Sequence, residues 1–210
     1  MKIVFFGDSI TDAGRSREED HTASCYGHGY VKYIVGDLIA SNPTKYEVYN
    51  RGISGNRIVD LYARVKSDVW NLQPDVLSIL IGVNDIWHEI ALKNGVDLVR
   101  FEKVYRMMIE ETLERLPNVK VILCEPFVLT GTATFENMSE FLEVKQYAKV
   151  VERLAQEYGL YFLPLQEKLE EAAKKYSPEL YLCDGVHPAT AGAKLIADEW
   201  LQLYKKELDK

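Results

Sequence analysis

The chain has 210 residues, of which 47% are apolar, and this is ample material for the core of one globular domain. Its formal net charge is −7, with 25 Lys and Arg scattered among 32 Asp and Glu. An acidic chain without a basic run is poorly suited to bind nucleic acid or an anionic membrane surface. We therefore expect a single domain over residues 1–210 with neither of these partners.

Cysteine usage and the N-terminal segment favour a cytoplasmic location. The cysteines Cys25, Cys124 and Cys183 leave an odd one and show no C-x-x-C spacing, so we expect reduced thiols and neither a disulfide framework nor a zinc site. Before Gly7 the chain offers one Lys and four consecutive apolar residues, too few for a signal peptide. No later run approaches the length of a membrane span. Export by another route is left open.

Short apolar runs predict the strands. They cover residues 3–6, 46–49, 76–81, 119–124 and 160–163. The first run is too short for a helix and reads as a buried strand, and Gly7 breaks it sharply. The run 76–81 is the strongest of the set, and 46–49 alternates least cleanly.

Between these runs the apolar residues recur at the helical spacing i, i+3, i+4, i+7. The predicted helices cover residues 31–38, 58–69, 101–113, 137–158, a segment before Tyr176, and 189–204. Ser54 and Asn56 are candidates to cap the second helix. Asn137 with Glu140 resembles a capping box that opens the fourth. Strands that alternate with helices predict a five-stranded parallel sheet with helices on both faces, since parallel strands need crossover connections.

Polar clusters directly follow three of the predicted strands. They are Gly7-Asp8-Ser9, residues 52–56 and residues 82–85, and parallel strands bring them to one edge of the sheet. A fourth cluster, residues 184–188, precedes the last helix. Its proline suits the first helical position, so His187 is expected to lie on a loop and point outward.

These residue types match the needs of acyl transfer. A serine hydroxyl needs an imidazole to take its proton, and the imidazole needs a carboxylate that fixes its tautomer. Ser9, His187 and Asp184 fit these roles, although a serine in this position could also be a helix cap. The tetrahedral intermediate needs donors for its oxyanion. The backbone N–H groups of Ser9 and Gly55 and the side-chain amide of Asn84 fit that role.

Four sequence blocks, in order over residues 7–188, resemble those of the SGNH hydrolase superfamily, also called the GDSL lipase/esterase family. They are Gly7-Asp8-Ser9-Ile10, in which Ile10 replaces the usual Leu, then Gly55, then Gly82-x-Asn84-Asp85, and finally Asp184-x-x-His187-Pro188. The resemblance implies a flavodoxin-like three-layer α/β/α sandwich and ester hydrolysis without metal or cofactor. It implies the roles just given for Ser9, Asp184, His187, Gly55 and Asn84.

The loop residues within these blocks are most similar to bacterial acetylxylan esterases and related carbohydrate O-deacetylases. The segments are 7–15, 29–31, 52–56 and 82–87. This implies a serine esterase that removes O-acetyl groups from acetylated sugars or xylo-oligosaccharides through an acyl-enzyme on Ser9. The loops hold few large aliphatic residues beyond Ile10 and Ile53, which favours a small acyl group.

Candidates to line the substrate site are Asp8, Tyr26, Trp87 and Tyr181. Aromatic rings stack on the apolar faces of sugars, but ordinary packing is the alternative for each of the three aromatic residues. Asp8 either stabilises the turn before Ser9 or tunes that serine. Asp85 is expected to cap a helix or to accept a hydrogen bond from a backbone amide.

Other functions remain as alternatives. A lysophospholipase, thioesterase or arylesterase would use the same triad. A flavin- or nucleotide-binding module would suit the same architecture, but neither G-x-x-x-x-G-K-[ST] nor G-x-G-x-x-G occurs. A non-catalytic carbohydrate-binding protein would not need a complete triad. We expect an ester of a small molecule or oligosaccharide as the partner, and a homo-oligomer is left open.

Overall fold

The computed structural model describes residues 1–18 and 22–208. Within these residues, one parallel sheet contains β1 (Lys2–Gly7), β2 (Glu47–Gly52), β3 (Val76–Leu80), β4 (Lys120–Cys124) and β5 (Tyr161–Leu163). The order across the sheet is β2-β1-β3-β4-β5, the flavodoxin-like order. The predicted strands and the predicted parallel sheet are therefore confirmed.

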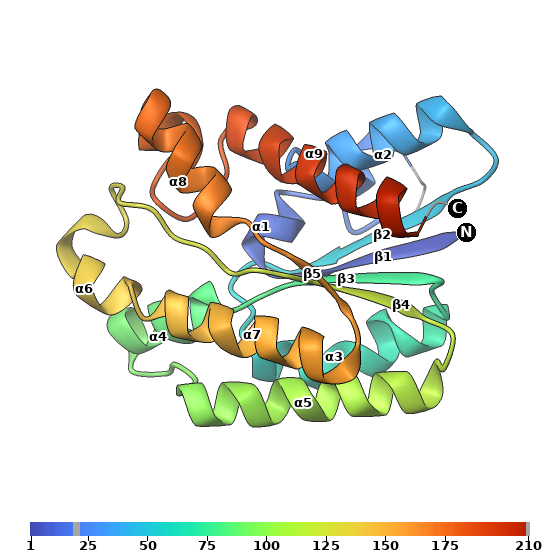
Figure 1. The fold of residues 1–210 in the computed structure, drawn as a ribbon, viewed down its shortest axis with the longest axis horizontal. Coiled ribbons are helices and arrows are strands. Elements are labelled where there is room, and N and C mark those ends of the chain that lie inside the picture. The colour runs from blue at the N-terminus through green and yellow to red at the C-terminus, as the bar shows by residue number, and fades with distance from the viewer. Residues whose placement is uncertain (19–21, 209–210) are drawn as a thin grey trace.

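Helices cover both faces of this sheet (Figure 1). One face carries α2 (Tyr30–Ser41) and α9 (Thr190–Glu207), and the other carries α3 (Ile58–Asp68), α5 (Leu98–Arg115) and α7 (Val144–Tyr158). Shorter helices are α1 (Ser9–Asp12), α4 (Val83–Leu92), α6 (Met138–Phe141) and α8 (Gln166–Lys175), and 3₁₀ turns are η1 (Ala23–Tyr26), η2 (Trp70–Leu72), η3 (Phe135–Asn137) and η4 (Pro178–Leu180). The predicted α/β/α sandwich is confirmed. In the described part of the chain, no helix is both long and apolar enough to cross a bilayer.

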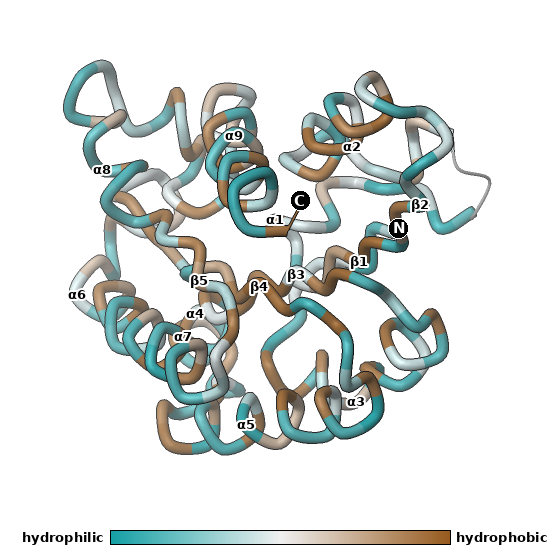
Figure 2. Tube along the Cα trace, turned by 45° about the vertical axis from the view of Figure 1, so that its right-hand side comes forward, coloured by the Kyte–Doolittle hydropathy of each residue, from teal (hydrophilic) through white to brown (hydrophobic). Residues whose placement is uncertain are grey.

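The core lies between the central strands and the inner faces of the helices (Figure 2). Residues 3–6 of β1 are fully buried, because helices pack on both sides of a central parallel strand. Trp200 of α9 packs on Phe5, with ring centroids 5.1 Å apart, and its Nε1–H donates to Ser78 Oγ at 3.0 Å. This bond satisfies the buried indole and fixes the last helix to the sheet.

The strand order also locates a crevice. The chain passes from β1 to β2 on one side and then crosses to β3 on the other side, so the connection reverses between β1 and β3. Ligands of open α/β sheets bind outside the carboxyl ends of the strands at such a point. Ser9 follows β1 and Asn84 follows the end of β3, so both lie at this position.

Two details of the predicted helices are wrong, the continuity of one helix and the cap of another. The segment 137–158 is not one helix, since α6 ends at Phe141 before α7 begins, and the Asn137 side chain makes no capping hydrogen bond. Helix α3 is not capped by Ser54 or Asn56. Its N-terminal turn is instead closed by Asp60, whose carboxylate accepts the backbone N–H of Arg57 at 2.8 Å. Helix α4 was not predicted at all.

Candidate active site

Ser9 is the first residue of α1 and is presented by a tight turn at the end of β1. The carboxylate of Asp8 accepts the backbone N–H of Ile10 at 2.9 Å, so Asp8 rather than Ser9 caps the helix. A side chain at Gly7 would overlap the side chain of Thr11, so this turn requires a glycine. The Ser9 hydroxyl is thereby left available for another partner.

That partner is His187, 178 positions further along the chain. Ser9 Oγ lies 2.9 Å from His187 Nε2, and His187 Nδ1 lies 2.6 Å from Asp184 Oδ2. The other oxygen of Asp184 accepts the backbone N–H groups of Val186 at 2.9 Å and His187 at 2.8 Å. The three side chains form a continuous hydrogen-bonded line with the geometry of a Ser-His-Asp triad.

The charges in this line support each other. Partial burial of Asp184 disfavours its charged form, but the hydrogen bonds from the ring and backbone of His187 outweigh burial and lower the pKa of Asp184 to about 2. In turn, the hydrogen bond to Asp184 raises the pKa of His187 above its ordinary value of 6.5, although burial opposes the shift. Asp184 is therefore a carboxylate across the physiological range, ready to stabilise an imidazolium.

The loop that carries Asp184 is held by the segment after β4. The N–H of Leu129 donates to Gly185 O at 2.8 Å, and the N–H of Ala133 donates to Asp184 O at 2.9 Å. A Cβ on Gly131 would overlap the backbone of Asp184 and Gly185, so the close approach depends on this glycine. The sequence predicted only a loop here. A glycine within a polar segment was the sole signal of the contact.

Backbone and side-chain donors face the same edge of the sheet. Residues 53–56 form a β-turn closed by the N–H of Asn56 to Ile53 O at 3.2 Å, and Gly55 has φ +81°, as is typical of the third residue of a type II turn. Within the described part of the chain, the N–H groups of Ser9 and Gly55 donate no hydrogen bond. Asn84 Nδ2 donates to Asn56 O at 3.1 Å, which leaves its second N–H for another acceptor.

Asn84 and Asp85 occupy the first turn of α4, which begins after Gly82 at φ +140°. Asp85 is 1% exposed, and its carboxylate accepts the backbone N–H of Ile58 at 3.0 Å. The prediction that Asp85 serves a backbone amide is confirmed. Burial raises the pKa of Asp85 well above its ordinary value.

The candidate substrate-lining residues differ in exposure. Asp8 is 1% exposed and Tyr26 is 7% exposed, so neither side chain has much surface to offer a substrate. Burial raises the pKa of Asp8 to about 7. Trp87 and Tyr181 are half-buried, and the ring centroid of Trp87 lies 5.8 Å from that of His187. Of the four candidates, Trp87 contacts the triad directly.

A cavity of about 640 Å³ lies between α4, α5, α6 and α7, and among its described lining residues are Glu89, Lys93, Asp97 and Glu143. None of Ser9, Asp184 or His187 lines it. Among residues 1–18 and 22–208, no three His, Cys, Asp or Glu side chains cluster so that they could hold a metal ion. What the described residues do assemble at the sheet edge is a serine hydroxyl, an imidazole, a carboxylate and three N–H groups that can donate hydrogen bonds.

Comparison with protein families gives one match over most of the chain. A sequence model of the GDSL-like Lipase/Acylhydrolase family matches residues 5–195. The chain belongs to this family. It is accordingly a carboxylic ester hydrolase.

Three matches to this GDSL-like hydrolase extend along almost the whole length of both chains. An acetylxylan esterase from Geobacillus stearothermophilus is 38% identical over 208 residues, which cover 96% of this chain and 92% of the relative. The solved structure of the esterase Axe2 from the same organism matches with a TM-score of 0.85 at 37% identity, over 96% and 93% of the two chains. A protein from Parabacteroides merdae, described as a GDSL-like lipase, matches with a TM-score of 0.92 at 36% identity, over 97% and 95%.

Proposed function

We propose that this GDSL-like hydrolase removes O-acetyl groups from acetylated xylo-oligosaccharides by way of an acetyl-enzyme on Ser9. The observation that carries the proposal is the hydrogen-bonded line from Ser9 through His187 to Asp184. The relatives add support, since one is an acetylxylan esterase and solved Axe2 variants are described as an acetyl-xylooligosaccharide esterase. Axe2 structures described as catalytic mutants replace a serine, an aspartate and a histidine by alanine.

Acylation begins with the neutral imidazole. As Ser9 Oγ attacks the acetyl carbonyl carbon, His187 Nε2 takes the hydroxyl proton across the 2.9 Å contact. Asp184 accepts the hydrogen bond from His187 Nδ1 and stabilises the imidazolium that forms. The carboxylate remains ionised throughout, in keeping with its low pKa.

Negative charge develops on the carbonyl oxygen as the tetrahedral intermediate forms. The N–H groups of Ser9 and Gly55 and the side-chain amide of Asn84 are the donors that would stabilise it. The intermediate collapses when the C–O bond to the sugar breaks, and His187 gives its proton to the departing sugar oxygen. Water then attacks the carbonyl carbon of the acetyl-enzyme while His187 takes one of its protons. The bond to Ser9 Oγ breaks, His187 returns the proton to that oxygen, and acetate is released.

The surroundings of Ser9 favour a small acyl group. The adjacent Ile10 is 3% exposed and packs in the core, so it offers no apolar surface to an acyl chain. On the loop after β2, Ile53 is half-buried and lies between polar or small residues. A long acyl chain would therefore gain little from burial beside the nucleophile.

A substrate panel tests the proposal. Acetate release from acetylated xylo-oligosaccharides would be compared with hydrolysis of 4-nitrophenyl acetate and 4-nitrophenyl butyrate. We expect acetylated xylo-oligosaccharides to be turned over, and the acetate ester to exceed the butyrate ester in kcat/KM. Preference for butyrate, or for longer esters such as lysophospholipids, together with inert acetylated sugars, would contradict it.

A further inference from the structure

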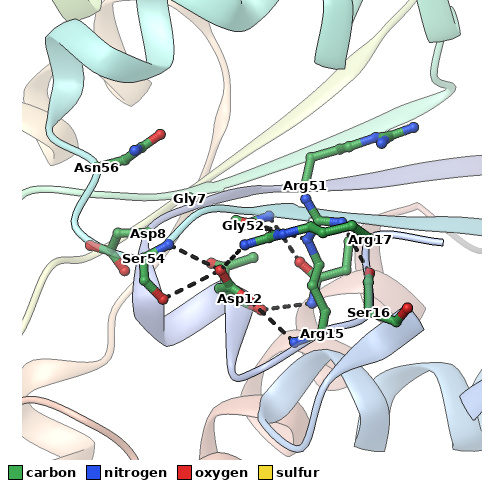
Figure 3. Close-up of polar contacts among 12 residues, drawn as sticks. Gly7, Asp8, Asp12, Arg15, Ser16, Arg17, Arg51, Gly52, Ser54 and Asn56 are labelled. Atoms are coloured by element: carbon green, nitrogen blue, oxygen red, sulfur yellow. Dashed lines mark hydrogen bonds and ion pairs between the residues drawn. The ribbon is translucent and has the colours of Figure 1, made fainter. Parts of the chain in front are cut away.

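Asp12, at the last position of α1, is a buried carboxylate outside the proposed triad and oxyanion hole. It is 3% exposed, and its carboxylate faces Ser54 on the loop that follows β2 (Figure 3). One of its oxygens accepts the backbone N–H of Ser54 at 3.0 Å and the Ser54 hydroxyl at 3.3 Å. The loop residue that precedes Gly55 is thus tied to the helix that begins with Ser9.

Two arginines complete the connection. Arg17 Nη2 donates to the same oxygen of Asp12 at 2.6 Å, and its Nη1 donates to Gly52 O at 3.0 Å. Arg15 Nε donates to Gly52 O at 2.9 Å, and the Arg15 backbone N–H donates to the other oxygen of Asp12 at 3.2 Å. Figure 3 shows these bonds converging on Asp12 and Gly52 from one side.

Close packing also restricts the backbone of the loop at Gly52. A Cβ added at Gly52 would overlap the backbone of Asp12, so the loop and α1 touch through their main chains. Burial, and then the neighbouring charge of Arg17, lower the pKa of Arg15 to about 10. The negative charge of Asp12 therefore also balances two crowded guanidinium groups.

The peptide between Ser54 and Gly55 is the central peptide of the turn and carries the Gly55 N–H. Type I and type II turns differ chiefly in the orientation of this central peptide, so a flip would reverse the direction of the Gly55 N–H. Ser54 is the second residue of the turn, and both its N–H and its hydroxyl are engaged by Asp12. A fixed Ser54 favours one orientation of the peptide that follows it.

We propose that Asp12 is a positioning residue that aims the Gly55 N–H at the oxyanion and holds it in register with Ser9. The proposal rests on the proposed function, in which Gly55 is an oxyanion donor. Asp12 and Ser9 belong to the same turn of helix, so the nucleophile and the donor loop are fixed to each other by one carboxylate. Asp12 itself does not touch the substrate.

The test measures kcat and KM for 4-nitrophenyl acetate in Asp12→Ala and Asp12→Asn. Loss of an oxyanion donor costs about 10²–10³ in kcat, and misalignment should cost less, so we expect Asp12→Ala to lower kcat about 10-fold to 100-fold with KM changed less than about twofold. The amide of Asp12→Asn retains one acceptor for the Ser54 N–H, so its loss should be smaller. In both variants the pH midpoint of the acid limb should match the wild type, because Asp12 is not among the groups that shift the pKa of His187.

Asp97→Ala is the matched control, since that carboxylate also accepts a backbone N–H, from Arg100, but at the start of α5. Rates are taken at a temperature where circular dichroism shows each variant folded, and Asp97→Ala should keep the wild-type kcat. If Asp12→Ala does not fold, the test uses Asp12→Asn and Arg17→Ala instead. Arg17→Ala removes the 2.6 Å ion pair between Arg17 and Asp12, and the same changes in kcat, KM and pH midpoint are measured. An unchanged kcat, a change in KM alone, or a shifted pH midpoint overturns the inference. An inactive wild type would instead refute the proposed function.

Discussion

The indole of Trp87 lies against the imidazole of His187, with ring centroids 5.8 Å apart and ring planes at 49°. Trp87 also meets Phe141 edge-on, with ring centroids 5.7 Å apart and ring planes at 76°. The tryptophan thus contacts both the core and the proposed general base. It limits the orientations open to the imidazole.

Trp87→Ala should therefore lower kcat on 4-nitrophenyl acetate. An aromatic pair contributes about 0.5–1.5 kcal/mol beyond its buried area, so a loss of about twofold to tenfold is expected. The measurement uses a small ester, because on an oligosaccharide the loss of sugar stacking on Trp87 would also change KM. Trp87→Phe keeps a ring beside His187 and should lie closer to the wild type. Equal kcat in Trp87→Ala and the wild type would show that the ring contact has no effect on catalysis.

The acid limb of the pH–rate profile should have its midpoint above pH 6.5. Only neutral His187 can accept the proton from Ser9, so kcat/KM falls as the imidazole is protonated. The hydrogen bond to Asp184 favours the imidazolium and raises the pKa of His187 from 6.5, which moves the loss of activity to higher pH. Rates of 4-nitrophenyl acetate hydrolysis between about pH 5 and about pH 9 measure this midpoint. A flat profile would exclude an imidazole base.

Asp8→Asn should move that midpoint to lower pH. The charge of Asp8 contributes, after Asp184, to the raised pKa of His187, and an amide carries no charge. The variant keeps an oxygen that can accept the Ile10 N–H, so α1 should remain capped. The pH–rate profiles of Asp8→Asn and the wild type, measured side by side, give the two midpoints. A shift to higher pH would contradict this interaction.

The same variant should be more stable than the wild type above pH 7. Burial raises the pKa of Asp8 from 3.8 to about 7 in the folded protein, so the unfolded chain loses this proton at lower pH than the folded one. Ionisation of Asp8 therefore reduces stability as the pH rises through this window, and the uncharged asparagine avoids that loss. The melting temperatures of Asp8→Asn and the wild type are compared at about pH 5 and about pH 8. A variant that is less stable at the higher pH would rule out a costly buried charge.

Asn84→Ala should reduce kcat by about 10²–10³, the usual cost of losing one oxyanion donor. Asn84→Asp keeps the size of the side chain but puts a carboxylate where the oxyanion develops, so its loss should be at least as large. KM for 4-nitrophenyl acetate should change little in either variant. Normal turnover by Asn84→Ala would remove this residue from the proposed oxyanion hole.

The sheet was predictable because its strands are uninterrupted apolar runs. Runs such as residues 3–6 and 76–81 indicate strands buried on both faces, and their alternation with helical patterns indicates parallel strands. The structure has that arrangement. Loops at the carboxyl ends of parallel strands share an edge, so the meeting of the Ser9 and Asn84 loops followed from the same logic. His187 lies on the loop between α8 and α9 and not at the end of a strand, so its place beside Ser9 was predicted from the chemistry of the triad and from the family resemblance.

The missed features depend on contacts that no local pattern reveals. Ser54 does not cap α3 because its hydroxyl and N–H are held by Asp12, and Asn56 accepts from Arg64 Nε at 2.7 Å. Asn84 and Asp85 lie in the first turn of α4, although these residue types indicate a turn when they come close behind a glycine. Only the long-range partner of Asp85, the N–H of Ile58, explains its place in a buried helical turn.

Acetate release by Ser9→Ala tests the central claim most directly. The substrate is an acetylated xylo-oligosaccharide, and circular dichroism establishes that the variant is folded. Removal of the hydroxyl leaves His187 with no nucleophile to activate, so kcat should fall by about 10⁴-fold or more, to the level supported by binding alone. A kcat of Ser9→Ala within about tenfold of the wild-type value would contradict an acyl-enzyme on Ser9.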